Sequence, residues 1–136
     1  MTHEEALEFV RAHHRAVLAT RRRDAGVQLS PVIAAVDDQG MVIVSTREGA
    51  MKARNLSRDP RATLCVFTDR FFGEWHTLEG LAQILSLPEA MEPLVDYYRR
   101  VSGEHPDWVE YRQAMEREKR VLLRIRVERS GPTESG

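Results

Sequence analysis

The stretch Val42–Leu56, VIVSTREGAMKARNL, has the pattern of a strand, a tight turn and a helix, and the rest of the chain is organised around it. The strand is apolar and β-branched, and Gly49 permits the sharp bend that follows. Lys52 falls in the first turn of the helix, where backbone N–H groups have no partner inside the helix. Such a helix N-terminus, beside a lysine and the hydroxyls of Ser45 and Thr46, attracts anions. The stretch therefore predicts a phosphate-binding site.

The bulk composition is typical of one globular domain. The chain has 136 residues, of which 42% are hydrophobic and 30% are charged. That length accommodates one core, so we expect a single domain over residues 1–129 and a flexible C-terminal tail over 130–136. A net charge of −1 indicates no general affinity for nucleic acid or for membrane surfaces, and we expect neither as a partner.

The expected compartment is the cytoplasm. The longest apolar run, Val32–Val36, is too short to span a bilayer. The N-terminal stretch Met1–Glu5 is acidic and has no apolar signal region. The one cysteine, Cys65, lies in an apolar run, which excludes an intrachain disulfide and favours a buried thiol in a strand.

The remaining pattern predicts a small antiparallel barrel with helices packed outside it. Pro31 has no N–H and belongs at an edge, at a bulge or where the backbone faces a ligand, and Gly80 marks a β-bulge. Six strands in so short a chain need closure to avoid exposed edges. The expected elements are helix 3–14, strands 16–20, 27–36 and 41–45, helix 49–57, strands 61–68 and 74–85, helices beginning at 88 and at 106 or 107, and strand 121–127.

Motifs for several kinds of chemistry are absent from the sequence. It contains no nucleophile elbow and no phosphate loop, and its five histidines lack the spacing of metal ligands. We therefore assign no catalytic residue, and we expect no metal site.

A cluster of basic residues surrounds Lys52. On the expected helix, Lys52 lies at the margin of the buried face and can reach inward, whereas Arg54 and Arg58 share a different face and are expected in solvent or paired with Asp59. On charge alone, a basic surface helix is as good an interpretation as an anion site. The cluster consists of Arg47, Lys52, Arg54, Arg58 and Arg61.

Several motifs taken together resemble one family. In chain order they are similar to the split-barrel flavoproteins of the pyridoxamine-phosphate-oxidase-like superfamily, and most of all to its reductases that use the deazaflavin coenzyme F420. The resemblance extends over the chain to residue 127. The motifs are Ala19-Thr20, Gln28–Pro31, Ser45–Arg61, Tyr98–Trp108 and Lys119–Leu123.

The resemblance implies a mainly β fold with flanking helices (α+β), a six-stranded antiparallel split β-barrel of the FMN-binding type. It also implies a homodimer with coenzyme F420, or alternatively FMN, bound in two grooves between the subunits. Aromatic residues of the loop after the fourth strand are expected to reach the partner's site or to pack in the dimer interface. The implied cofactor contacts are Lys52, Ser45 and Thr46 at the phosphate, Gln28, Ser30, Pro31 and Val32 along the ring, Arg54 and Asn55 at the tail, and Phe71, Phe72 and Trp75 from the partner.

The implied function is an F420-dependent oxidoreductase that transfers a hydride from the reduced deazaflavin to a small, electron-poor substrate, quinone-like or enone-like. Because the cofactor carries this chemistry, the lack of an acid–base pair in the sequence does not argue against an enzyme. Two alternatives stay open, an FMN-binding oxidoreductase on the same fold and a non-catalytic flavin- or deazaflavin-binding protein. A haem or other tetrapyrrole ligand also stays open, although no histidine stands out as an axial ligand.

Overall fold

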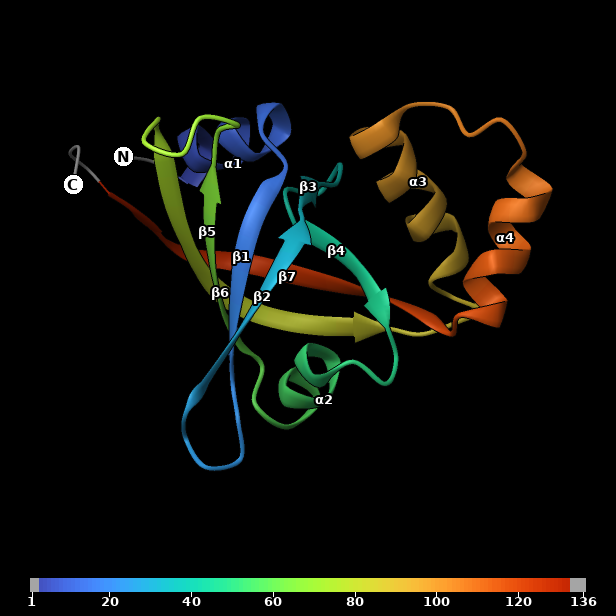
Figure 1. Ribbon diagram of the computed structural model, residues 1–136, viewed down its shortest axis with the longest axis horizontal. Coiled ribbons are helices and arrows are strands. Elements are labelled where there is room, and N and C mark those ends of the chain that lie inside the picture. Colours follow the sequence, from blue (N-terminus) through green and yellow to red (C-terminus); the bar gives the residue numbers. More distant parts are fainter. Residues whose placement is uncertain (1–2, 133–136) are drawn as a thin grey trace.

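The computed structural model describes residues 3–132 and contains seven strands and four helices in that range (Figure 1). Most elements lie within a few residues of their expected bounds. In chain order they are α1 (His3–Ala12), β1 (Arg15–Arg21), β2 (Val27–Ile33), β3 (Ala35–Val36), β4 (Val42–Arg47), α2 (Met51–Arg58), β5 (Arg61–Phe67), β6 (Trp75–Leu85), α3 (Met91–Ser102), α4 (Trp108–Arg117) and β7 (Arg120–Gly131).

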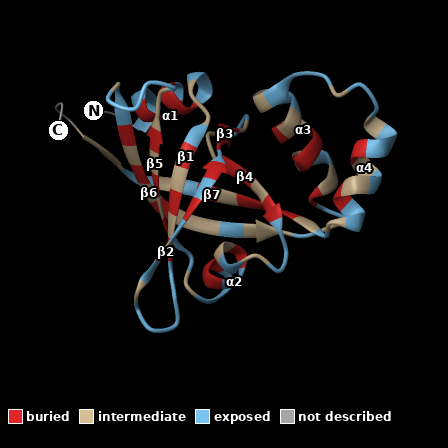
Figure 2. Ribbon diagram, in the orientation of Figure 1, coloured by how far each residue is buried: buried red, intermediate tan, exposed pale blue. Residues whose placement is uncertain are grey.

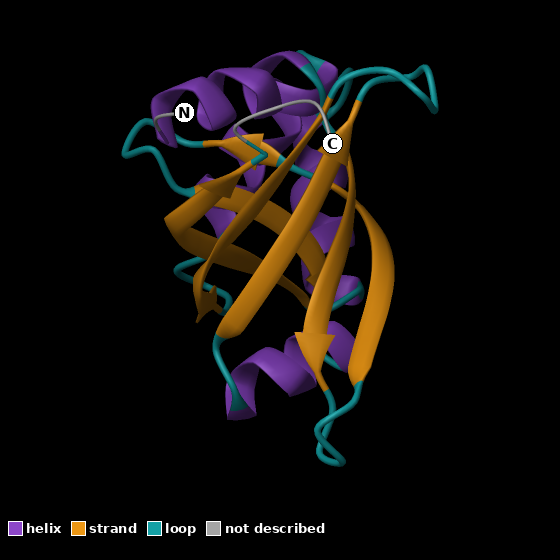
Figure 3. Cartoon of the chain, turned by 90° about the vertical axis from the view of Figure 1, so that its left-hand side faces the viewer, coloured by secondary structure: helices purple, strands orange, loops and turns teal. Residues whose placement is uncertain are grey.

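The strands form one curled antiparallel sheet in the order β2-β1-β5-β6-β7-β4-β3. Figure 3 shows this sheet as a single curved layer, with helices behind it and at its two ends. The expected mainly β fold with flanking helices is confirmed. Among residues 3–132, no helix has the length and apolar character needed to cross a membrane.

The strand count is seven rather than six because the chain changes neighbours at Ala34. β2 pairs with β1, whereas β3 pairs with β4. Between them the Ala34 N–H donates to the His14 carbonyl at 2.7 Å, and the Ala34 carbonyl lies 2.8 Å from Nδ1 of His14. The expected strand 27–36 is therefore divided at this corner, which curls the sheet.

Three further boundaries bear on the expectations. β2 ends the strand order, so the edge position expected for Pro31 is confirmed. α3 begins at Met91 rather than at Pro88, because Pro88 lies in a turn whose carbonyl accepts from the Met91 N–H. β7 continues to Gly131, where Ser130 pairs with Leu78, so residues 130 and 131 belong to the sheet and not to the expected tail. Residues 133–136 of that tail lie outside the described range.

Two apolar clusters hold the elements together. One fills the concave side of the sheet beneath α1 and α2 and includes Leu18, Val44 and Leu64. The other lies between the α3–α4 pair and the opposite side of β4 and β7, where Ile43 and Leu122 meet Leu94. Buried and half-exposed residues alternate along β1, β5 and β6 (Figure 2), so one face of these strands points away from the core.

Gly80 allows the bulge that the sequence predicts, and its replacement tests the sheet. The register of β6 against β7 shifts between Glu79 and Gly80, and a Cβ at Gly80 would overlap the Arg126 carbonyl oxygen. We expect Gly80→Ala to lower the free energy of unfolding by about 2 kcal/mol, because the backbone of β7 cannot yield as a side chain can. Urea unfolding measures this. Gly49→Ala is the matched control, since a Cβ there meets nothing within 4 Å. An equal loss in both variants would contradict the packing argument.

Candidate functional site

The N-terminus of α2 has the features of an anion site. α2 begins at Met51, and Lys52 lies in its first turn, as the sequence predicts. The N-cap residue, Ala50, makes no side-chain capping hydrogen bond, and the first turn contains no acidic residue. The positive end of the helix dipole therefore lies beside Lys52 without a compensating group from its own helix.

Three cationic side chains come together beside this N-terminus. Arg47, at the end of β4, is the register partner of Arg120, at the start of β7. Burial lowers the pKa of the Lys52 ammonium, and the nearby charge of Arg120 lowers it further. Oε1 of Glu118 lies 2.8 Å from Nη2 of Arg120 and 3.7 Å from Nη2 of Arg47. Three cations thus gather where the end of β4, the start of β7 and α2 approach one another (Figure 1).

Arg120 is the residue that sequence reasoning missed. It lies in the quoted motif Lys119–Leu123, but nothing in that motif shows which strand it pairs with. The turn before β7 is held against the turn after β4 by a hydrogen bond from the Glu48 N–H to the Lys119 carbonyl at 2.8 Å. This non-local contact is what brings Arg120 to the α2 N-terminus.

The two hydroxyls expected at the phosphate lie on opposite sides of β4. The Thr46 side chain is buried, whereas Ser45 is half-buried. Tyr97 of α3 lies against Ser45: burial raises the pKa of Tyr97, and the Ser45 N–H and the Arg120 charge oppose that shift. The Tyr97 hydroxyl also donates to the Ile33 carbonyl at 2.7 Å. The structure therefore places Ser45 near Arg120 and removes the Thr46 side chain from the surface.

The β2 residues expected along a ring also divide between two faces. Pro31 is exposed, whereas the side chains of Ser30 and Val32 are buried. Adjacent strand residues point in opposite directions, so the Val32 side chain faces the core and does not share the exposed surface of Pro31. Oε1 of Gln28 is buried and has no hydrogen-bond partner in the described chain. β2 contacts both α2 and β4, and its outer edge has no strand neighbour within residues 3–132.

Asn55 links α2 to the sheet. Its side chain is only 1% exposed, and its Nδ2 donates to the Thr20 hydroxyl at 3.1 Å. Its Oδ1 accepts from Arg58 at 3.3 Å, and Arg58 also donates to the Arg21 carbonyl at 2.7 Å. Arg58 is exposed, as expected, but its contacts are these and not Asp59, which pairs with Arg61. Asn55 thus holds the helix in place rather than presenting its amide at the surface.

Asn55→Ala should destabilise the fold. Truncation leaves the buried Thr20 hydroxyl without its partner, and we expect a loss of about 2 kcal/mol in the free energy of unfolding. Urea denaturation gives the value. Arg54→Ala, on the exposed face of the same helix, should change it by less than about 0.5 kcal/mol. If Asn55→Ala proves equally neutral, Asn55 is not the tie between α2 and β1.

Arg54 lies in a basic groove between α2 and the β1–β2 turn. The groove has a volume of about 620 Å³, and Asp24 is the one carboxylate among its lining residues. Residues 21–26 connect two expected strands, and the sequence does not show that this connection approaches α2. The cationic lining residues are Arg22, Arg23, Arg54 and Arg58.

The convex side of β2, β1, β5 and β6 has an uncharged centre, which we call the bare face. The strand register places its members side by side, for example Val17 between Pro31 and Cys65. Charged residues border this centre: Arg15 and Arg21 lie at the two ends of β1, and Glu79 lies within β6. The members are Val17, Ala19, Leu29, Pro31, Ile33, Thr63, Cys65, Phe67, Trp75 and Thr77.

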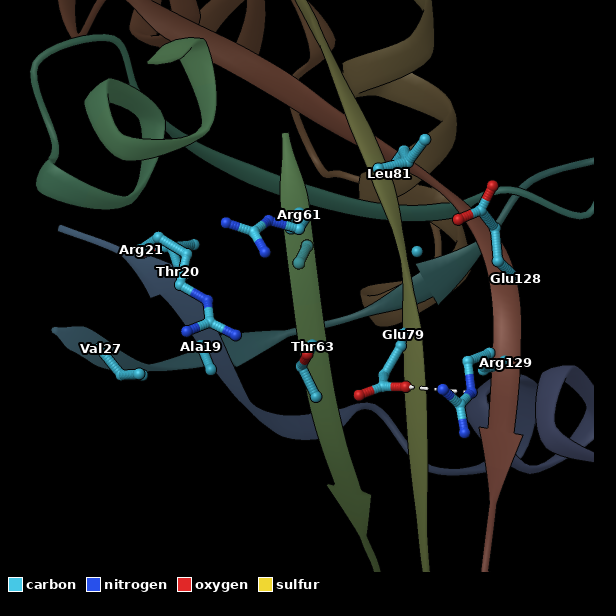
Figure 4. Close-up of a pocket in the computed structure, with 12 residues that line it drawn as sticks. Ala19, Thr20, Arg21, Val27, Arg61, Thr63, Glu79, Leu81, Glu128 and Arg129 are labelled. Carbon is cyan, nitrogen blue, oxygen red and sulfur yellow. Dashed lines mark ion pairs between the residues drawn. The ribbon is translucent and has the colours of Figure 1, made fainter. Parts of the chain in front are cut away.

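A second groove, of about 420 Å³, lies at the margin of the bare face. Figure 4 shows side chains from β1, β5, β6 and β7 lining it, with Glu79 paired to Arg129 at 3.7 Å. Arg21 and Arg61 approach it from the other side (Figure 4). Its arginines are accompanied by two glutamates, Glu79 and Glu128, so positive charge predominates less than at the α2 site.

The aromatic residues expected from a partner subunit lie far from Lys52 within one chain. β5 runs from the end of α2 to the loop that contains Phe71 and Phe72, so this loop and α2 lie at opposite ends of β5 (Figure 1). Phe71 and Phe72 are 80% and 90% exposed, and their rings meet edge to face at 5.0 Å. Trp75 pairs with Phe67 at the border of the bare face. Within one chain these residues therefore do not reach the α2 site.

No group of three or more His, Cys, Asp or Glu side chains within residues 3–132 could hold a metal ion. His76 is the most buried histidine of the described chain; its Nε2 lies 2.8 Å from Glu74, and its ring packs on Phe9. It lies beneath α1, away from the α2 site, and takes no part in it.

Comparisons with known proteins agree with the fold. The model of the pyridoxamine 5'-phosphate oxidase family matches residues 2–133, so the chain belongs to that family.

Solved structures of similar fold have diverse descriptions. A conserved hypothetical protein of Mycobacterium tuberculosis, Rv2991, is 30% identical with a TM-score of 0.77, over 96% of this chain and 82% of that one. An F420 reductase is 18% identical with a TM-score of 0.72, over 91% and 94%. The haem-storage protein HutZ of Vibrio cholerae is 18% identical with a TM-score of 0.71, over 94% and 92%. The last two show a shared fold only.

Proposed function

We propose that this protein is an F420-dependent oxidoreductase that acts as a homodimer on a small, electron-poor substrate, quinone-like or enone-like. The observation that carries the proposal is the cationic site at the α2 N-terminus, beside the free edge of β2. An F420 reductase of the same fold and an oxidoreductase family support the class of reaction.

The residues present fit the anionic part of such a cofactor. Lys52, Arg120 and the uncapped helix N-terminus would hold its phosphate, with Ser45 beside them. The basic groove with Arg22, Arg23 and Arg54 continues along α2 and suits a carboxylate-bearing tail. FMN has the phosphate but no such tail, and this groove is what favours F420 over FMN.

The free edge of β2 would hold the ring. Unpaired backbone groups of an edge strand can donate to and accept from the polar side of a flavin-like ring. Exposed Pro31 offers a flat apolar surface on the same strand. Gln28 shares the inner side of β2 with Ser30 and Val32, and its Oε1 is buried there. The ring would thus be oriented mainly by backbone and not by the Ser30 and Val32 side chains.

The bare face would form the dimer interface. An uncharged centre with a charged margin is the anatomy of a subunit contact, and apolar patches of this kind are seldom left exposed. In a two-fold dimer that packs these faces with opposed strand directions, the β5–β6 loop of one copy reaches the α2 end of the other. The partner's Phe71, Phe72 and Trp75 would then cover the ring and exclude water.

Reduced deazaflavin supplies a hydride when it is bound. The chain's own residues bind its phosphate, orient its ring and keep solvent away, and we assign none of them as a proton donor. The proton that follows the hydride would come from solvent.

The proposal is tested by titrating the purified protein with coenzyme F420 and with FMN, following cofactor fluorescence. We expect saturable binding of F420, one per chain, with weaker binding of FMN. Binding of FMN alone would replace this proposal with an FMN-dependent oxidoreductase. Failure to bind either cofactor would overturn it, and a parallel titration with haem distinguishes a tetrapyrrole-binding protein, the role described for one structural neighbour.

A further inference from the structure

Glu118 occupies a place that the proposed function does not explain. It is the C-cap residue of α4, and its carboxylate lies among the cations that would bind the phosphate. Oε1 of Glu118 accepts from Nε of Arg120 at 2.9 Å and lies 3.7 Å from Arg47. The hydrogen bond from Arg120 holds the pKa of Glu118 below its ordinary value, and the charges of Arg120, Arg47 and Arg117 add to this effect. Glu118 is therefore ionised at neutral pH.

The arrangement places one anion against a surplus of cations. Arg47, Lys52 and Arg120 carry three positive charges, and Glu118 contacts two of the three. Lys52 lies near Arg120, whose positive charge lowers the pKa of the Lys52 ammonium because the two charges repel each other. A phosphate bound between them would relieve that repulsion and would compete with Glu118 for the guanidinium of Arg120.

We propose that Glu118 is an internal counter-ion that a phosphate displaces, and that Arg120 is the second phosphate-binding residue of the site. In this role Glu118 holds the guanidinium of Arg120, and lies beside that of Arg47, before the ligand arrives. It also weakens binding, because the ligand must take Arg120 from a carboxylate that already holds it. Groups with too little negative charge to displace Glu118 are thereby excluded. The inference rests on the proposed phosphate site, although not on which cofactor carries the phosphate.

The test uses inorganic phosphate as the probe and follows the Nε–Hε nuclear magnetic resonance signal of Arg120, assigned with the Arg120→Gln variant. In the wild-type protein this signal should shift saturably with phosphate. In Glu118→Gln, affinity for phosphate should rise roughly 5- to 10-fold, the scale of one partly exposed, charge-assisted contact. Glu110→Gln is the matched control, because Glu110 pairs with exposed Arg117 at 2.8 Å on α4, and it should bind phosphate as the wild type does.

Equal or weaker phosphate affinity in Glu118→Gln, with an unchanged unfolding midpoint, would overturn the inference, as would an Arg120 signal that phosphate does not move. The same variants are then titrated with two ligands: F420, and the deazaflavin part of F420 without its phosphate and tail. A gain for F420 alone supports the inference, and an equal gain for both ligands contradicts it. If phosphate behaves as expected and F420 does not bind, the proposed function fails while the role of Glu118 stands.

Discussion

Replacing Lys52 with glutamine should weaken the binding of F420 by about 10- to 100-fold, the loss expected for one charge-assisted hydrogen bond to a phosphate. Lys52 lies half-buried in the first turn of α2, and burial and the nearby charge of Arg120 lower the pKa of its ammonium. Binding of an anion beside it would relieve both penalties. Fluorescence titration of F420 into wild-type and variant protein measures the ratio.

Two controls separate a phosphate contact from a general effect of charge. Lys119→Gln removes the same charge from the neighbouring turn, where the side chain is exposed, and should change F420 affinity by less than about threefold. The deazaflavin without its phosphate should bind Lys52→Gln and the wild type equally. If the Lys52→Gln variant binds F420 with unchanged affinity, the assignment of the cofactor phosphate to this site is wrong.

Replacing Leu29 with glutamate should dissociate the proposed dimer. Leu29 lies in the bare face beside Ala19, and two-fold symmetry would bury two new charges in one interface. Since unpaired interfacial charges cost several kcal/mol, we expect the dissociation constant of the dimer to rise at least about 100-fold. Sedimentation velocity over a range of concentrations measures this, and F420 affinity should fall with it because the partner's loop is lost.

Val109→Glu is the matched control for this substitution. Val109 is 67% exposed on α4 and Leu29 is 64% exposed on β2, so the two changes add the same charge to equally exposed apolar residues. Only Leu29→Glu should alter the assembly. A wild-type protein that sediments as a monomer, or a Leu29→Glu variant that remains a dimer, would show that the bare face is not the interface.

Local pattern was enough to predict the elements and the position of Lys52. Alternation, Gly49 and the apolar spacing of α2 are short-range features, and they place Lys52 in the first helical turn. The same alternation also shows that the side chains of Pro31 and Val32 face opposite sides, so the two cannot both lie along one ring as expected. Ser45 and Thr46 divide between two faces for the same reason.

Other features depend on contacts between distant parts of the chain. The expected second strand is divided at Ala34 because its first part, β2, pairs with β1 and its second part, β3, pairs with β4. No residue type in the sequence indicates this change of neighbour. Arg120 reaches the site only because β7 pairs with β4 in a register that sets it opposite Arg47. Asn55 resembles a surface residue in sequence, but Thr20 and Arg58 give it partners that make its burial favourable.

The central claim is that this chain uses bound deazaflavin for hydride transfer, and turnover tests it most directly. Reduced F420 is mixed with the wild-type dimer and a panel of quinones and enones, and the recovery of oxidised F420 is followed by its absorbance. We expect oxidation that requires both the protein and at least one acceptor, and that slows in Lys52→Gln when F420 is below saturation. Binding of reduced F420 without its oxidation by any member of the panel would contradict the claim and would identify a cofactor-binding protein that is not an enzyme.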